Sequence, residues 1–359
     1  MSRRPIAQIN IDALQHNFNH IRSIAPQSKV LAVLKANAYG HGLLAVAEQL
    51  KAAGAFGVAR IDEALMLRAG GIVKPIVLLE GFFHPDELPQ IVASNLQVVV
   101  HHRSQVEALL AADLEAPIHV WLKIDSGMHR LGIYPTEFQS LYQQLVASPK
   151  VLKPLRLMTH FACADEPDNP STQAQLALFT DLIQGCEAEL SIANSAGVLA
   201  WPQSHGDWIR PGLALYGVSP MLAGRSAQHG LRPVMTFSSS VIAVREVKKG
   251  DAVGYGASWI APADTNLAVV AIGYGDGYPR NAPSGTPVLI NGQRLPIVGR
   301  VSMDMTMVDI GQQQVQVGDP VVLWGEALPV EEIAELVQTI PYELLCNITS
   351  RVQLRYVTD

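Results

Sequence analysis

The sequence predicts a (β/α)8 TIM-like barrel followed by a smaller, mostly β-strand domain, which makes the fold class α/β plus β. Short apolar runs alternate with helical stretches eight times within roughly the first 220 residues, a pattern that favours a closed barrel over an open sheet. From about residue 230 onward the helical stretches nearly vanish and strand signals crowd together. The chain has 359 residues, more than a single core usually serves. We therefore expect a barrel over residues 1–228 and a β domain over residues 229–359.

The barrel strands are expected where short apolar runs stop at polar or small residues. Segments with helical periodicity separate these runs, for example residues 62–68, which end at Gly70 and Gly71, and residues 173–183. The eight strands are expected at residues 30–35, 56–59, 76–80, 97–100, 118–124, 155–160, 190–193 and 208–216.

The second domain is expected to consist mainly of hairpins. Asn291 and Gly292 form a two-residue turn signal between two strand-like halves of one apolar run. A segment rich in Pro, Gly and Ser at residues 219–232 marks the junction with the barrel. The strands are expected at residues 240–245, 267–272, 288–297 and 319–324.

Composition excludes several classes of function. The formal charge is -6, from 26 Lys and Arg against 32 Asp and Glu, so no basic surface for nucleic acid is indicated. No run of about 18 apolar residues occurs and no apolar segment follows the first arginines, so we expect no membrane span and a cytoplasmic location. Cys163, Cys186 and Cys346 lack metal-ligand spacing, which fits reduced thiols and no metal.

Lys35 is the first candidate for chemistry. It ends the apolar run of residues 30–34 and is followed at once by Asn37, Tyr39 and two glycines. A lysine ammonium is costly in such a place unless it is paired, lowered in pKa or used in a covalent bond. Lysine also condenses with carbonyl compounds, including pyridoxal phosphate (PLP). Lys35 is therefore a candidate for a Schiff base.

Polar side chains follow nearly every expected barrel strand. In barrels of this kind the chemistry lies at the carboxyl ends of the strands. Any one of these residues also fits a plain surface position, but as a set they give Lys35 the neighbours it needs. Small residues at 194–197 and 211–212 suit a phosphate, although ordinary turns use the same types. The set is Lys35, Arg60, Glu80, His101, Asp125, His160, Asn194, Ser195 and Arg210.

Seven short blocks, in order along the chain, resemble the motifs of the bacterial alanine racemase family. The first, residues 32–42 (AVLKANAYGHG), is similar to that family's PLP-attachment signature. The others are residues 125–132 (DSGMHRLG), 208–212 (WIRPG), 254–258 (GYGAS), 273–278 (GYGDGY), 299–304 (GRVSMD) and 341–342 (PY). The resemblance implies a PLP-dependent enzyme that interconverts L- and D-alanine and supplies D-alanine for peptidoglycan. It also implies a homodimer with shared active sites.

The resemblance assigns roles to individual residues. Lys35 would attach PLP and act as a base on one face of the amino-acid substrate, and Tyr255 of the other subunit would act on the opposite face. Arg210 would meet the pyridine nitrogen, which stays unprotonated because a guanidinium only donates. His160 would pack beside Arg210, and Arg130 would lie near the phenolic oxygen of PLP and the substrate. The phosphate-binding set would be Tyr39, Ser195, Gly212, Leu213 and Tyr342.

The remaining assignments concern substrate entry and one buried lysine. Met303 and Asp304 match residues near the substrate carboxylate, and Tyr274 matches a tyrosine of the entry corridor. Lys123 lies within an apolar run and matches a lysine that many family members carry as a carbamate. An ordinary ion pair between Lys123 and Asp125, or another nearby carboxylate, is the alternative.

Three other functions are alternatives to an alanine racemase. A basic amino-acid decarboxylase of the same architecture would typically place a glutamate where Arg210 stands and a catalytic cysteine in the β domain, and no matching motif surrounds Cys346. A small PLP-binding homeostasis protein would lack the β domain that contains Tyr255. A racemase with a broader substrate range stays open, since pocket size around Tyr342, Ser302 and Ala164 does not follow from their identities.

Overall fold

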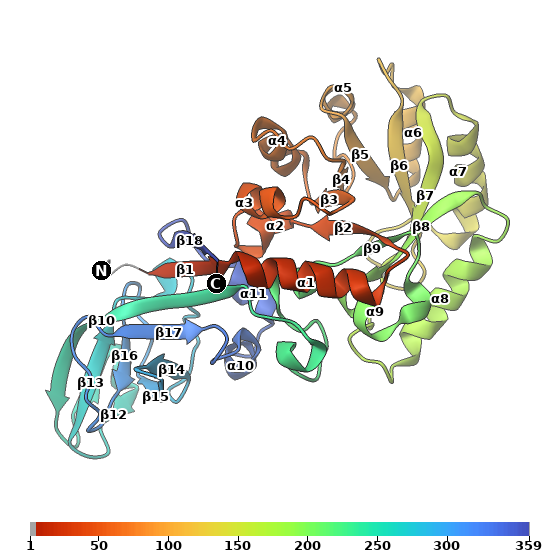
Figure 1. The fold of residues 1–359 in the computed structure, drawn as a ribbon. Coiled ribbons are helices and arrows are strands. Elements are labelled where there is room, and N and C mark those ends of the chain that lie inside the picture. The colour runs from red at the N-terminus through yellow and green to blue at the C-terminus, as the bar shows by residue number, and fades with distance from the viewer. Residues whose placement is uncertain (1–4, 359) are drawn as a thin grey trace.

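A computed structural model describes residues 5–358 and shows a closed parallel barrel joined to a β-rich domain (Figure 1). Each barrel strand pairs in parallel with the next, and the last pairs with the first. The predicted fold class is confirmed. The barrel strands are β2 (Lys29–Val33), β3 (Ala55–Val58), β4 (Ile76–Leu78), β5 (Leu96–Val100), β6 (Ile118–Lys123), β7 (Val151–Met158), β8 (Ala188–Asn194) and β9 (Trp208–Arg210).

Helices surround the barrel and begin at residues suited to helix starts (Figure 1). Asn10 and Asn169 accept hydrogen bonds from the first turns of their helices, and Pro135 and Pro170 occupy first positions, where no N–H is needed. The helices are α1 (Ile11–Ile24), α2 (Lys35–Tyr39), α3 (Leu43–Gln49), α4 (Ile61–Ala69), α5 (Leu88–Ala93), α6 (Arg103–Ala111), α7 (Pro135–Ala147), α8 (Pro170–Leu182) and α9 (Ser195–Ala200).

The last barrel strand is shorter than the sequence predicts. β9 ends at Arg210 because Pro211 has no N–H with which to extend the ladder, and residues Leu213–Tyr216 form a 3-10 turn, η3. The expectation that strand structure continues to residue 216 is therefore wrong. The consequence is that a turn of buried, largely apolar side chains follows Arg210.

The second sheet has the order β13-β16-β15-β14-β17-β10-β1-β18. All four predicted strand regions are confirmed, with the Asn291-Gly292 turn between β14 and β15. The strands are β1 (Ile6–Asn10), β10 (Met235–Val247), β13 (Thr265–Val270), β14 (Pro287–Ile290), β15 (Gln293–Val298), β16 (Thr306–Asp309), β17 (Pro320–Trp324) and β18 (Gln353–Val357). A small ribbon joins β11 (Ala252–Val253) to β12 (Trp259–Ile260).

Strand β1 lies in this second sheet, between β10 and β18, although it precedes every barrel strand. Two short helices, α10 (Val330–Leu336) and α11 (Pro341–Cys346), also come from the C-terminal region. Gly40 packs against the main chain of α11 so closely that a Cβ there would overlap the Leu345 carbonyl. The end of α2 is therefore covered by a segment of the β domain.

Candidate active site

Lys35 begins a left-handed helical turn. The four residues that follow it, Ala36–Tyr39, all have φ between 53° and 55°. None of them is glycine, and this conformation costs roughly 1–2 kcal/mol for each such residue. Two side chains stabilise the turn: Glu63 Oε1 accepts the Ala36 N–H at 2.7 Å, and Asn37 Oδ1 accepts the Leu43 N–H at 2.9 Å. Strain that the surrounding structure maintains beside a reactive lysine points to a functional site.

His41 supports the same turn from inside the protein. Its ring is fully buried, lies 4.6 Å from the Tyr216 ring, and approaches the Tyr39 carbonyl at 2.8 Å through Nδ1. Burial lowers the pKa of His41 to about 4. The imidazole is therefore neutral at physiological pH, and Nδ1–H donates to the carbonyl.

Arg210 lies on the floor of the site at the end of β9 and is buried. Its Nη1 donates to Ser191 Oγ at 2.7 Å, and its Nη2 donates to the carbonyls of Thr159 at 2.6 Å and Ile192 at 3.1 Å. Nη2 also lies 3.3 Å from His160 Nδ1. The pKa of His160 lies well below its usual value because of burial and of the neighbouring Arg210 charge. A neutral ring nitrogen can therefore accept from the guanidinium.

A cradle of hydroxyl groups and backbone N–H groups forms beside Arg210. Ser195 Oγ accepts from the N–H of Gly212 at 2.8 Å and of Ala214 at 3.3 Å. A Cβ at Gly212 would overlap the Tyr39 hydroxyl, so only glycine allows that hydroxyl to approach. Buried Leu213 begins the η3 turn over this point. These groups could bind the phosphate of a cofactor.

Three tyrosine rings stack along one side of the cradle. Tyr39 lies 4.8 Å from Tyr216 and 5.9 Å from Tyr342, measured between ring centroids. Tyr216 Oη donates to the Val33 carbonyl at 2.9 Å. Burial raises the pKa of Tyr342 to about 12 and raises that of Tyr39 further, so both hydroxyls stay protonated and can donate. Helix α11 thus brings Tyr342 beside Tyr39 of the barrel.

Lys123 is buried under the site and makes no hydrogen bond or ion pair within residues 5–358. Burial lowers its pKa to about 8, and the charges of Arg210, Arg130 and Lys35 lower it too. Asp125 does not pair with it, because its Oδ1 accepts the N–H groups of Gly127 and His129 in a tight turn. The structure therefore does not contain the ordinary Lys–Asp pair.

Arg130 is the exposed member of this cationic group. Its charge acts on both Lys123 and His160, which places it at the same mouth of the barrel as Lys35 and Arg210. Lys35, Lys123, Arg130, His160 and Arg210 thus lie close enough to act on one another electrostatically. The positive charges of Arg130 and Arg210, near the cradle of Ser195 and Gly212, favour an anionic ligand.

Among the described residues, no hydrogen bond, ion pair or ring contact joins Lys35 to the β-domain candidates Tyr255, Tyr274, Met303 and Asp304. Tyr255 lies in the turn Tyr255–Ala257 between β11 and β12, is 68% exposed, and belongs to the part of the domain remote from the barrel (Figure 1). Met303 is about half exposed. Asp304 Oδ1 accepts from Arg351 Nη2 at 2.6 Å, and Arg280 lies over the Tyr274 ring at 5.8 Å.

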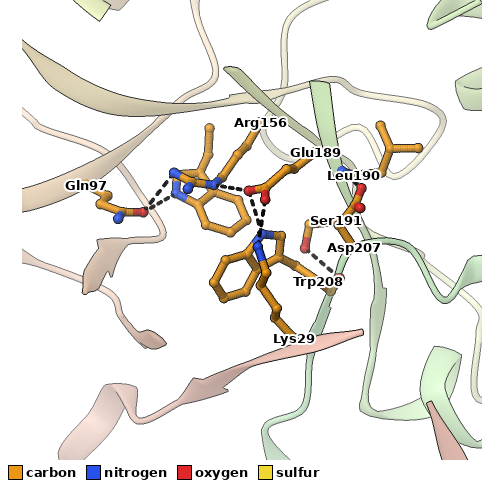
Figure 2. Close-up of polar contacts among 9 residues, drawn as sticks. Lys29, Gln97, Arg156, Glu189, Leu190, Ser191, Asp207 and Trp208 are labelled. Carbon is orange, nitrogen blue, oxygen red and sulfur yellow. Dashed lines mark hydrogen bonds and ion pairs between the residues drawn. The ribbon is translucent and has the colours of Figure 1, made fainter. Parts of the chain in front are cut away.

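A polar cluster that the sequence analysis missed joins side chains from several barrel strands (Figure 2). Arg156 Nε donates to Glu189 Oε2 at 2.8 Å, and its guanidinium lies over the rings of Trp121 and Trp208 at 5.1 and 5.7 Å. Lys29 Nζ meets Glu189 Oε1 at 2.8 Å. A usable signal existed, because Arg156 and Glu189 are opposite charges inside two consecutive strands.

Alternation along the strands places this cluster one layer below the site. Lys123 follows Trp121 by two residues, and Arg210 follows Trp208 by two, so each pair faces the same side of its strand. Gln97 Oε1 accepts from Trp121 Nε1 at 2.9 Å and from Arg156 Nη1 at 3.3 Å. The cluster therefore closes the amino end of the barrel and leaves the carboxyl end for chemistry.

The barrel and its site together fit a class: two-domain barrel enzymes in which a phosphorylated, anionic cofactor can bind beside a lysine. Residues 9–220 match the family description "Alanine racemase, N-terminal domain", and residues 234–356 match "Alanine racemase, C-terminal domain". The chain belongs to the alanine racemase family.

Individual relatives agree with this family over the full length of the chain. The alanine racemase of Vibrio cholerae serotype O1 is 56% identical over 98% of this chain and 97% of its own. That of Shewanella baltica is 58% identical over 98% of this chain and 99% of its own.

Solved structures share the fold. A biosynthetic alanine racemase from Pseudomonas aeruginosa has a TM-score of 0.96 and 44% identity over 99% of this chain and 100% of its own. An alanine racemase from Bartonella henselae, described with covalently bound pyridoxal phosphate, has a TM-score of 0.92 and 31% identity over 99% of this chain and 100% of its own.

Three further findings concern membrane spans, metal ligands and cysteines. In the described part of the chain, no helix combines the length and apolar character needed to cross a membrane. Within the same residues, no three His, Cys, Asp or Glu side chains are grouped as metal ligands. The three cysteines are free thiols.

Proposed function

We propose that this chain is a PLP-dependent racemase that interconverts L- and D-alanine and supplies D-alanine for peptidoglycan. Family membership over both domains supports the reaction, and the Bartonella henselae relative supports the cofactor. The observation that carries the proposal is the arrangement of Lys35 and Arg210 at one barrel mouth, with Ser195 and the Gly212 N–H between the strands.

The residues present fit PLP. When bound, PLP withdraws electrons from the substrate α-carbon and so makes its proton acidic. Lys35 would bind the cofactor covalently, Arg210 would donate to the ring nitrogen, and Arg130 would lie near the phenolic oxygen and the substrate. The cradle would bind the phosphate through Tyr39, Ser195, Gly212, Leu213 and Tyr342. The missing Cβ at Gly212 is the structural support for that cradle.

Two opposed groups would exchange the α-proton. Lys35 Nζ would remove or return it on one face, and Tyr255 of the partner subunit would do so on the other. The exposure of Tyr255 supports this division, because the same chain's barrel does not use that side chain. The protein would therefore work as a homodimer with shared active sites.

Arg210 would limit the electron withdrawal. A guanidinium donates and does not accept, so the ring nitrogen it meets receives no mobile proton. His160 is neutral, since burial and the Arg210 charge lower its pKa, and it accepts from the guanidinium instead of competing with it. A weaker electron sink suits a reaction that only returns a proton.

We also propose that Lys123 carries a carbamate. Its neutral amine would attack carbon dioxide and release one proton, which turns a buried cation into an anion. The three neighbouring cations and the lack of a partner support this, and a pKa near 8 provides neutral amine at physiological pH. The anion would orient Arg130 toward the substrate.

The β domain would complete substrate binding across the dimer. Met303 and Asp304 would lie near the substrate carboxylate, and Tyr274 would line the entry corridor. The bond between Asp304 and Arg351 supports this placement, because a paired carboxylate repels an anionic substrate less than a free one.

We propose the division of the chain into a barrel of residues 1–228 and a β domain of residues 229–359, with β1 as a strand lent to the second sheet. The gap between Arg210 and the start of β10 at Met235 supports this boundary. We further propose a cytoplasmic location, for which the free thiols fit a reducing compartment.

Mixing two inactive variants tests the shared site. Lys35→Ala and Tyr255→Phe should each lose racemase activity as homodimers. Coexpression in equal amounts should restore about a quarter of wild-type activity, because half of the dimers are mixed and each mixed dimer has one intact site. No recovery, with mixed dimers confirmed by differential tags, would contradict the arrangement.

Isotope exchange and substrate range test the chemistry. In deuterium oxide, Tyr255→Phe should suppress α-proton exchange mainly from L-alanine, and equal loss from both enantiomers would argue against two faces. An assay across alanine, serine, lysine and arginine separates an alanine racemase from one of broader range. Release of carbon dioxide from lysine or arginine would instead indicate a decarboxylase.

A further inference from the structure

The guanidinium of Arg210 is anchored at two nitrogens by different kinds of group. The two hydrogens of Nη2 are shared among three acceptors, the carbonyls of Thr159 and Ile192 and His160 Nδ1. Nη1 makes one bond, to the hydroxyl of Ser191 at 2.7 Å. Of the five N–H donors, the Nε–H and one Nη1–H are left over. Ser191 is therefore the one side-chain hydroxyl that fixes the second nitrogen.

The Ser191 hydroxyl is itself oriented. Its hydrogen is donated to the Trp208 carbonyl at 3.0 Å, a bond that Figure 2 shows, so the oxygen presents a lone pair to Arg210. The side chain is fully buried, and the Ser191 carbonyl accepts the Thr159 N–H at 3.2 Å. Glu189, two residues earlier on β8, belongs to the polar cluster beneath. Ser191 thus joins a rigid layer to the floor of the site.

Without this hydroxyl, every remaining contact of the guanidinium would lie on Nη2. The Arg210 guanidinium could then turn about Nη2, whereas hydrogen bonds at both Nη1 and Nη2 fix the plane of the group. We propose that Ser191 is a positioning residue that fixes the Arg210 guanidinium so that its free donors, the Nε–H and the second Nη1–H, keep one orientation toward the cofactor ring. This inference rests on the proposed function.

Cofactor affinity of the apoprotein is the main test. PLP would be removed from the purified dimer and titrated back into wild type, Ser191→Ala and Ser191→Thr, with binding followed by protein fluorescence. Ser191→Ala should bind PLP about tenfold more weakly, because PLP would then have to immobilise a guanidinium that Ser191 no longer orients. Ser191→Thr keeps the hydroxyl and should stay within about threefold of wild type.

A matched control separates positioning from general destabilisation. Ser239 is also a buried serine, and its Oγ donates to the Ala271 carbonyl at 2.7 Å. It lies in β10 of the second sheet, whereas Arg210 ends a barrel strand. Ser239→Ala and Ser191→Ala should lower the melting temperature by similar amounts. Only Ser191→Ala should weaken PLP binding and reduce the visible circular dichroism of the bound cofactor.

Kinetics give an independent outcome. Ser191 does not face the substrate, so Ser191→Ala should lower kcat about tenfold and leave the KM for alanine within about twofold. If Ser191→Ala does not fold, Ser191→Cys, which keeps the volume and bonds only weakly, replaces it. Unchanged PLP affinity and kcat in a folded variant would overturn the inference. Failure of wild type to bind PLP would instead overturn the proposed function.

Discussion

Replacing Glu189 by glutamine should destabilise the barrel without touching the site. The carboxylate accepts three hydrogen bonds, from Lys29 Nζ, Arg156 Nε and Trp208 Nε1, at 2.8, 2.8 and 2.9 Å. An amide can offer its single oxygen to these donors, and its NH2 group would face a donor. Glu189→Gln therefore leaves both Lys29 and Arg156 without a charged partner, and at least one of them without a hydrogen-bond acceptor.

The pKa of Glu189 sets the size of the effect. Burial raises this pKa, but the bonds from Lys29, Trp208 and Arg156 outweigh burial and bring it from 4.5 to about 2. At about 1.36 kcal/mol for each pH unit, that is at most about 3 kcal/mol. The side chain is 20% exposed, so solvent screening reduces the expected loss to about 1–2 kcal/mol. The melting temperature should fall by about 2–8 °C.

The pH dependence has a definite sign. The folded pKa lies below the unfolded one, so this stabilisation is full above about pH 4.5 and is lost as pH falls toward 2. The difference in melting temperature between wild type and Glu189→Gln should therefore be constant from about pH 8 to 5 and shrink below about pH 4.5. Differential scanning calorimetry of the PLP-loaded dimers measures it.

A surface pair provides the control. Asp264 pairs with Lys248 at 3.0 Å, with both side chains more than 60% exposed, so Asp264→Asn should shift the melting temperature by less than about 1 °C. The reasoning is refuted if Glu189→Gln melts at the wild-type temperature at neutral pH. A difference that is as large at pH 3.5 as at pH 7.5 would refute the assignment to the carboxylate.

Three other substitutions have expected outcomes. Ala36→Gly should raise the melting temperature by about 1–3 °C, since glycine relieves a positive φ in the left-handed turn, and calorimetry measures it. Gly217→Ala should sharply reduce the yield of folded protein in a soluble-expression assay, because a Cβ there would overlap the Arg232 carbonyl and φ is +72°. Lys123→Ala should lose most racemase activity and regain part of it in added acetate, which can supply the missing anion; recovery with chloride alone would count against a carboxylate-like group.

The barrel was predictable because its strands are short apolar runs with clear ends. Residues 76–80 and 97–100, for example, overlap β4 and β5 closely. Strand β1 was not predicted, because five residues with apolar side chains at Ile6, Ala7 and Ile9 give a weak signal. Its partners lie more than 200 residues away, so pairing does not follow from local pattern.

The sequence predicts which residues are candidates for the site, but not the geometry in which they lie. Lys35 was expected to end a strand, but it begins a turn in which four residues without glycine have positive φ, and no propensity indicates that. Ser191 went unnoticed because a serine inside a strand is ordinary. Its importance depends on a bond to Arg210, which comes from the neighbouring strand.

Strand β1 imposes an order on the assembly of this protein. It is synthesised before any barrel strand, yet the strands on both of its sides, β10 and β18, are synthesised after the whole barrel. During that interval its backbone N–H and C=O groups have no sheet partners, and an open strand edge can pair wrongly with another chain. The barrel can close while β1 is still unpaired. Correct folding therefore requires β10 and β18, which are synthesised late, to pair with β1, which is synthesised first.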